Sequence, residues 1–351
     1  MATAYHYVAI NQRKSLILIV LFALSFLGFV YLATWGFYIL NGTLAYFRPT
    51  GFLTWGSTWD HAFVQTADTC RWLLPISLAI SLFWARVALK EGETFILGRF
   101  DRRVRFLHPY DEYDANTLLT TLCIRTGDIV PHIYVLNDKG LNAFSVGSTP
   151  ENSGIVLTAG LLQTLDRVQL EAVLAHELAH IRNGDTRLMT VMVMCLAFFT
   201  FMGEYLFYGT EKENIYDNNG LQVERIAPPL GPLAYIGFVL LLYGYVVAPL
   251  LRLGISRTRE YLADADAALI TRHPRALAKA LWRISQNSRI SSLASSSLLG
   301  AMCIENPLEK ESLFDFLSGL YRSHPPVEDR IYALNDMDGM FLHIPATANQ
   351  K

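Results

Sequence analysis

Cysteine is scarce in this chain, and its few cysteines are far apart. The 351 residues include only four, none of which forms a C-x-x-C pair: Cys70, Cys123, Cys195 and Cys303. The sequence therefore indicates neither a disulfide framework nor a thiolate metal site. Any metal ion must be held by histidine and carboxylate side chains.

Charge is scarce as well. Charged residues make up 17% of the chain, the formal net charge is -2, and no block of basic residues of the kind that binds nucleic acid occurs. We therefore expect no nucleic-acid partner. Hydrophobic residues make up 52% of the chain, which is more than an ordinary soluble enzyme carries.

The excess of hydrophobic residues lies in four runs. Residues 15–40 and 232–251 contain no charge, and each run reaches the length of about 20 residues that a helix needs to cross a bilayer. Residues 72–89 form another run, and we expect Pro75 to lie in the first turn of its helix. The run at 188–202 is short, so it either crosses or is partly buried in protein. We predict about four transmembrane helices, the first of which is too long for a cleaved signal peptide and is a retained anchor.

Basic residues flank the runs asymmetrically. Arg13 and Lys14 precede the first run, and several basic residues follow the second: Lys90, Arg99, Arg102, Arg103 and Arg105. Residues 41–71, which we expect to form a loop, contain only two basic residues, Arg48 and Arg71. By the positive-inside rule, the N-terminus and the segments after the second and fourth runs face the cytoplasm. We also expect residues 207–231, which are rich in acidic side chains and include two prolines, to form a loop.

The most informative stretch is residues 176–180, which read H-E-L-A-H. Residues four apart lie on one face of a helix, so His176 and His180 can point at a single metal ion with Glu177 beside them as a base. A capping-box pattern at 166–169 predicts where this helix begins, and Gly184 predicts its end. The alternative is a pair of ordinary core or surface histidines. A charged glutamate in so apolar a helix is costly without a purpose, which favours the metal site.

A hydrolytic zinc site takes three protein ligands and keeps one position for water, so a third ligand is required. Glu260 and Asp264 lie four residues apart in a helical pattern that directly follows the fourth hydrophobic run. Glu260 is the candidate ligand, and Asp264 can accept the other ring N–H of a ligand histidine. Taken alone, the pair also fits a solvated helix face. The 80 residues from His180 to Glu260 (260 − 180 = 80) are mostly the third and fourth runs, which as a hairpin would return the chain to the same side.

Between the second and third runs, the pattern changes from long apolar runs to short elements. Residues 114–123 are typical of a helix, and residues 132–136, 142–148 and 154–158 are typical of strands. These strands predict a small sheet beside the helix of residues 176–180. Its edge either binds an extended peptide through main-chain hydrogen bonds or only packs against the helix.

Several motifs together resemble those of the HtpX-type membrane zinc endopeptidases. They are H-E-L-A-H-I-R-N-G-D at 176–185, S-R-T-R-E-Y-L-A-D at 256–264, R-S-H-P-P at 322–326 ahead of Arg330, and L-N-A-F-S-V-G at 141–147. The resemblance covers most of the chain, from the first hydrophobic run to about residue 333. It implies cleavage of peptide bonds in membrane or misfolded proteins, with a role in quality control and stress response.

The resemblance also implies a set of site residues. It implies one zinc ion per chain with three ligands: His176, His180 and Glu260. Glu177 would be the general base. A catalytic role is implied for His324, although its place before two prolines equally fits a simple turn. The substrate-facing strand would contain Asn142, Ala143 and Phe144.

We therefore predict a mainly helical α+β membrane protein, in which a cytoplasmic zincin-type metalloprotease domain with a small β-sheet accompanies the transmembrane helices. The predicted parts are an anchor with two spans, two halves of the protease domain separated by a membrane hairpin, and a tail: 1–90, 91–187, 188–254, 255–340 and 341–351. The partners are polypeptide substrates and the lipid bilayer, and the location is a bacterial inner membrane. The alternatives are a non-hydrolytic adaptor stapled by zinc and a CaaX prenyl endopeptidase, whose family usually has more spans.

Overall fold

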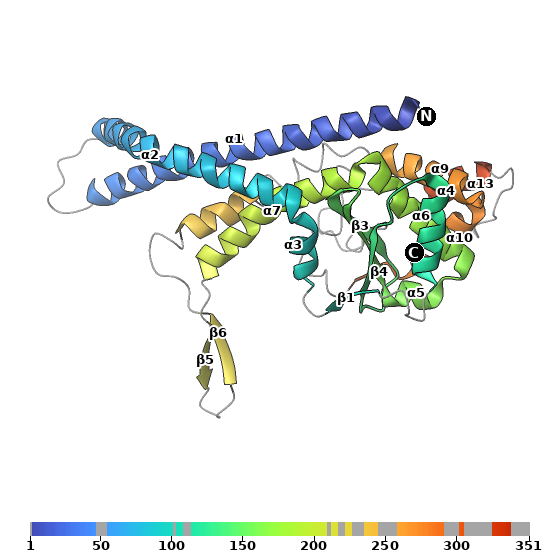
Figure 1. Cartoon of the computed structure of the whole chain (residues 1–351). Helices are drawn as coiled ribbons and strands as arrows, with labels where there is room; N and C mark the ends of the chain where they lie inside the picture. The colour runs from blue at the N-terminus through green and yellow to red at the C-terminus, as the bar shows by residue number, and fades with distance from the viewer. Residues whose placement is uncertain are drawn as a thin grey trace, which may run out of the picture. The chain divides into compact units, whose positions relative to one another are not determined.

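The computed structural model describes ten segments of the chain: residues 2–46, 55–100, 103–107, 114–208, 212–216, 222–226, 235–244, 258–290, 302–304 and 325–337. The chain divides into two compact units (Figure 1). The first, here called the sheet unit, contains Met1–Ser15, Leu89–Val193 and Pro249–Lys351. The second, here called the helix unit, contains Leu16–Ala88 and Met194–Ala248. The predicted catalytic residue His324 lies outside the described residues.

Three helices are long and apolar enough to cross a membrane. Helix α1 is Ala2–Tyr46, α2 is Trp55–Lys90 and α7 is Asp185–Tyr208, and their candidate spans are Val8–Asn41, Trp59–Lys90 and Asp185–Phe207. Large apolar side chains such as Trp72 and Phe83 are 73% and 66% exposed, as expected of side chains that face lipid.

We predicted four transmembrane spans, and the described residues contain three candidate spans. Within the fourth hydrophobic run, the described helix is Tyr235–Gly244, which at ten residues is shorter than a span. The remaining residues of that run, 232–234 and 245–251, lie outside the described part of the chain. The short third run, in contrast, belongs to a helix of 24 residues, because α7 begins earlier and ends later than the apolar stretch.

Aromatic contacts hold the helix unit together. The rings of Phe22 and Phe26 from α1 meet Phe198 from α7, with centroids 5.4 Å and 5.0 Å apart, both edge to face. The indole N–H of Trp84 from α2 donates a hydrogen bond of 2.9 Å to the carbonyl of Met194. Such specific packing and hydrogen bonding associate helices in lipid, where burial from water contributes little.

Two expected loops contain helices or strands in their described parts, and one proline lies elsewhere than expected. Most of residues 41–71 is helical, because α1 continues to Tyr46 and α2 already begins at Trp55, so Pro75 lies inside a helix and not in a first turn. Helices in membranes tolerate such a proline because their neighbours satisfy the freed carbonyl groups. The expected loop at 207–231 contains an antiparallel hairpin of β5 (Lys212–Tyr216) and β6 (Gln222–Ile226). Asn219-Gly220, a dipeptide typical of hairpin turns, was the overlooked signal.

A four-stranded sheet forms one part of the sheet unit. Its strands are β1 (Val104–Phe106), β2 (His132–Leu136), β3 (Ala143–Thr149) and β4 (Asn152–Thr158), in the order β1-β2-β4-β3. Strands β2 and β4 run parallel, and the other two pairs are antiparallel. Strand β3 therefore lies at an edge of the sheet. The three predicted strands are confirmed, with boundaries that differ by two residues or fewer.

The described helices of this unit pack against the sheet or against one another. They are α3 (Gly92–Gly98), α4 (Ala115–Thr126), α5 (Ala159–Thr164), α6 (Arg167–Asn183), α9 (Thr258–Thr271), α10 (Pro274–Gln286) and α13 (Val327–Met337). Helix α6 contacts β3 and β4 as well as α9 and α10, which makes it the central element of the unit (Figure 1). Its residues Val173 and Leu174 are fully buried in a core shared with Leu157 of β4 and Leu281 of α10.

Candidate metal centre

The two histidines of the H-E-x-x-H motif lie side by side on α6. The helix begins where the Asp166 side chain accepts a hydrogen bond from the backbone N–H of Gln169, and it ends at Gly184, which adopts the left-handed conformation with φ 74°. Both predicted boundaries are thus confirmed. His176 is fully buried and His180 is 9% exposed, and their Nε2 atoms are 3.1 Å apart.

Glu260 of α9 reaches both histidines from across the unit. Its Oε2 is 3.8 Å from His176 Nε2, and its Oε1 is 3.7 Å from His180 Nε2. One donor atom from each of the three residues lies within 4.8 Å of the others. Two zinc–nitrogen bonds of about 2.05 Å at a tetrahedral angle would place the two ring nitrogens about 3.3 Å apart, so the donor set fits a zinc ion.

Each histidine is aimed by a carboxylate on its other ring nitrogen. Asp264 Oδ1 lies 3.0 Å from His176 Nδ1, and Asp185 Oδ2 lies 3.0 Å from His180 Nδ1. Such carboxylates fix the tautomer and orientation of metal-binding imidazoles. The sequence predicted this position for Asp264 but not for Asp185, which the motif H-E-L-A-H-I-R-N-G-D contains as its last letter.

The α1 helix contributes to the support of Asp185. The side chain of Asn11 is buried, and its amide donates hydrogen bonds of 2.8 Å to Asp185 Oδ1 and 2.9 Å to the carbonyl of Asn183. Both partners are more than 170 positions away in the chain. No local sequence pattern could have indicated this contact.

Arg330 of α13 supports Asp264 in a similar way. Its guanidinium is fully buried and forms a two-pronged ion pair with Asp264, with hydrogen bonds of 2.8 Å from Nε and 2.7 Å from Nη2. Its Nη1 donates to the carbonyl of Ile304 at 3.0 Å and lies 3.5 Å from Glu260 Oε2. Burial raises the pKa of Asp264, but Arg330 and His176 outweigh this effect and hold the pKa below its usual value.

The carboxylates around His180 change its protonation. Burial lowers the pKa of this imidazole, but the charge of Glu260 and the hydrogen bonds from Asp185 and Glu260 outweigh burial and raise the pKa to about 10. Without a metal ion, His180 is therefore a cation at neutral pH, and a metal ion must displace its proton to bind.

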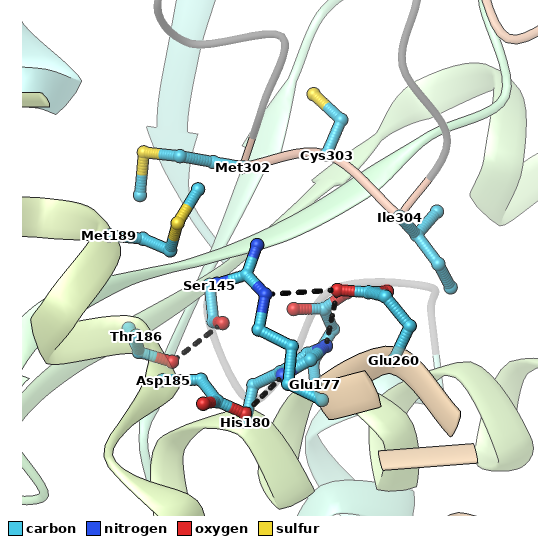
Figure 2. A pocket seen from close by; sticks show the side chains of 11 residues that line it. Ser145, Glu177, His180, Asp185, Thr186, Met189, Glu260, Met302, Cys303 and Ile304 are labelled. Carbon is cyan, nitrogen blue, oxygen red and sulfur yellow. Dashed lines mark hydrogen bonds and ion pairs between the residues drawn. The ribbon is translucent and has the colours of Figure 1, made fainter. Parts of the chain in front are cut away.

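A cavity of about 20 Å³ lies beside these donors. A single water molecule needs about 10–15 Å³, so the cavity has room for one. Glu177, His180 and Glu260 line it on one side, and residues 302–304 lie across from them, with the Cys303 side chain pointing away from the donors (Figure 2). Glu177 is 1% exposed, and its Oε2 has no hydrogen-bond partner in the described part of the chain.

The predicted substrate strand lies next to this cavity, but part of its edge is already paired. The carbonyl of Ala143 accepts a 2.8 Å hydrogen bond from the N–H of Ile304, and Phe144 forms an antiparallel bridge with Cys303. The Asn142 side chain donates to the carbonyl of Ser288. Because main-chain groups alternate along a strand, Ser145 presents its N–H and C=O to the same edge as Ala143, and Ser145 also lines the cavity.

The sequence of this chain is similar to those of known proteins of one family. The sequence profile of peptidase family M48 matches residues 124–338. A protein from Dictyoglomus turgidum named Protease HtpX homolog is 36% identical over 267 residues, which are 75% of this chain and 81% of the relative. A relative of the same name from Streptococcus equi subsp. equi is 31% identical over 278 residues, 77% of this chain and 88% of the relative.

A third relative of this name, from Dictyoglomus thermophilum, is 37% identical over 219 residues, 62% of this chain and 66% of the relative. Among solved structures, the crystal structure of S. mikatae Ste24p is 20% identical with a TM-score of 0.46, and the match covers 83% of this chain and 63% of that one. The chain therefore belongs to peptidase family M48, and within it to the HtpX-type membrane metalloproteases.

Proposed function

We propose that His176, His180 and Glu260 bind one zinc ion and that Glu177 is the general base of peptide-bond hydrolysis. The observation that carries the proposal is the approach of Glu260 to within 3.8 Å of both ring nitrogens from a helix that begins at Thr258. Zinc in such a site activates a water molecule and polarises the substrate carbonyl.

The remaining steps, proton transfer and orientation of the proposed ligands, are assigned to side chains of the chain. Glu177 takes a proton from the attacking water and delivers it to the amine that leaves, so one carboxylate serves both proton transfers. Its burial and its unused Oε2 keep it available for this exchange. Asp264 and Asp185 hold the two imidazoles in place, and Arg330 holds Asp264. We keep the proposed catalytic role of His324 as an expectation from the resemblance alone.

Peptide substrates are proposed to bind along the edge of β3. Asn142, Ala143 and Phe144 were expected to face the substrate. However, Ile304 and Cys303 already pair with Ala143 and Phe144. Ser145 is next along the same edge, with its C=O beyond the Phe144–Cys303 bridge, and this residue lines the cavity. An extended peptide would thus pair with β3 at Ser145, with its scissile bond over Glu177.

The substrates are proposed to be membrane proteins, or misfolded proteins at the membrane, cleaved at the cytoplasmic face of a bacterial plasma membrane for quality control. A single residue, Gly184, separates the site helix α6 from α7, a candidate span. The basic residues after the second and fourth hydrophobic runs favour the cytoplasmic side. The relatives named Protease HtpX homolog come from bacteria.

Zinc content and proteolysis of the purified full chain test the function together. We expect about one zinc per chain and chelator-sensitive cleavage of casein. Glu177→Gln should keep the zinc and lower the cleavage rate by at least about 10³-fold, because the other basic side chains that line the cavity, His180, Glu260 and Asp185, are the proposed zinc ligands and the carboxylate that orients one of them. Glu171→Gln, the same change on the same helix at a residue paired with Arg125, is the control. Full activity of Glu177→Gln would disprove the mechanism, and zinc without any cleavage would favour an adaptor stapled by metal.

A further inference from the structure

Arg259 lies directly before the proposed zinc ligand Glu260, and the function described so far does not use it. Its side chain is 9% exposed, and it lines the cavity together with Glu177 and His180. Its Nε lies 3.5 Å from Glu260 Oε1, and this Nε forms no hydrogen bond with any described residue. A buried N–H without a close hydrogen bond has a free-energy cost, and Nε of Arg259 is such a group.

The second arginine of the site shows what a purely supporting role looks like. Arg330 uses Nε, Nη1 and Nη2 in hydrogen bonds of 3.0 Å or less to Asp264 and the carbonyl of Ile304. Those contacts fix the position of the Arg330 side chain and use all three of its nitrogen atoms. Arg259 has no such set of contacts among the described residues, although its side chain is only 9% exposed, so a supporting role does not account for its position.

Two groups of opposite charge with unused hydrogen-bonding atoms therefore line the cavity. Glu177 Oε2 is an acceptor, and the Arg259 guanidinium is a donor. A peptide bond under attack by water needs both: a base for the proton of the water and a cation for the carbonyl oxygen. As the carbon–oxygen bond to the water forms, the π electron pair of the carbonyl moves onto its oxygen, which becomes negative.

We propose that Arg259 is a catalytic residue that donates hydrogen bonds to the carbonyl oxygen of the scissile peptide bond and stabilises its negative charge in the transition state. The inference rests on the proposed function of the same site. Glu260 at 3.5 Å orients the guanidinium without saturating it. Hydrogen bonds from a cation to an oxyanion are about twice as strong as neutral ones, and the loss of one such donor lowers kcat by about 10²–10³-fold in comparable hydrolases.

Two variants of the full zinc-loaded chain in detergent test this role. Arg259→Gln keeps an N–H donor and removes the charge, and Arg259→Lys keeps the charge on a different geometry. Arg125→Gln, in which an exposed arginine of α4 loses its charge, is the control. We expect kcat for an internally quenched peptide cut by the wild-type protein to fall about 10²-fold in Arg259→Gln, with KM changed less than about threefold. The lysine variant should recover part of the loss.

A binding measurement separates transition-state stabilisation from a structural role. A phosphonamidate analogue of the peptide carries a tetrahedral phosphorus with a negative oxygen, and its affinity is compared with that of the parent peptide in the Glu177→Gln background. We expect Arg259→Gln to weaken phosphonamidate binding at least about tenfold and to leave zinc affinity and parent-peptide affinity unchanged.

Two results would overturn the inference. The first is that Arg259→Gln keeps both its phosphonamidate affinity and its kcat within about threefold of wild type. The second is that the zinc affinity of Arg259→Gln falls as much as its kcat, which would mean that Arg259 only supports Glu260. A wild-type protein that cleaves no peptide would instead refute the proposed function, so the two failures are distinguishable.

Discussion

His180, a proposed zinc ligand, is the residue whose protonation would couple metal binding to pH. Burial lowers its pKa, but Glu260 and Asp185 raise it to about 10, above the value of about 6.5 of a free histidine. In the metal-free protein, the stabilisation from these carboxylates is therefore fully present below pH of about 6.5 and is lost as the pH rises through about 10. Between these values a zinc ion must displace the proton that the folded protein holds.

We predict that zinc binding releases at least one proton per ion at pH 7.5 and that zinc affinity rises about tenfold per pH unit between pH 7 and 9. Calorimetric titration of the metal-free protein in two buffers of different ionisation enthalpy measures the released protons. A zinc affinity that does not depend on pH would contradict the raised pKa of His180.

At the residue scale, the sequence predicted those site residues that lie close together in the sequence on the same helix. His176, Glu177 and His180 share a helix, and Asp264 lies one turn after Glu260, so helical periodicity alone placed each pair on one face. Arg259 and Asp185 lie within quoted motifs but were given no role. Asp185 contacts His180 from five residues away, but across the end of α6 at Gly184, where helical periodicity no longer applies. Arg259 lines the same cavity as Glu177 although the two residues lie far apart in the sequence, which no periodicity encodes.

At the scale of elements, the N-terminal part of α1 is an unexpected support of the metal centre. Asn11 is the buried donor to Asp185 and to the carbonyl of Asn183, and Asp185 in turn contacts His180. Removal of the amide leaves two buried acceptors without this donor, at a cost of about 1–3 kcal/mol for each unsatisfied group.

We therefore predict that Asn11→Ala weakens zinc binding about tenfold, within the range seen when residues behind a metal ligand are changed. Competition with a chelator of known affinity measures this change. Asn41→Ala on the same helix is the matched control, because its exposed amide donates only within α1, to the carbonyl of Phe37. A zinc affinity of Asn11→Ala within about twofold of wild type would show that Asp185 needs no help from α1.

The elements themselves were predicted with uneven success. The strands and the boundaries of α6 followed from alternation and capping residues, which are local signals. The helical extent of α1 and α2 beyond the apolar runs did not, because apolar length marks only the part of a helix that lies in lipid. The β5–β6 hairpin did not follow from the composition of residues 207–231, because acidic side chains and two prolines are typical of a loop.

For the whole molecule, the short distance between His180 and Glu260 constrains the topology. His180 Nε2 and Glu260 Oε1 are 3.7 Å apart, so both residues lie on the same side of the membrane. If α7 crosses the bilayer after His180, the chain must cross back before Glu260, and residues 232–251 are the uncharged run that can do so. The two crossings therefore occur together or not at all.

Reporter fusions test this pairing. We predict that alkaline phosphatase fused after Asn218 is active, which requires export, and that green fluorescent protein fused after Lys351 is fluorescent, which requires a cytoplasmic location. The phosphatase fused after Asn142, in the predicted cytoplasmic domain, is the inactive control. An inactive fusion at Asn218 would place the β5–β6 hairpin in the cytoplasm and remove both crossings.

The contact between His180 and Asp185 also limits how this enzyme can be simplified. Asp185 is the first residue of α7, and only Gly184 stands between it and the helix that carries both histidines. A water-soluble catalytic fragment could be made by deleting the hydrophobic segment from the first residue of α7 onward. This deletion would remove Asp185, one of the two carboxylates that orient the histidine rings. Trimming for crystallisation or display should therefore keep at least the opening turn of α7, and Asn11 with it.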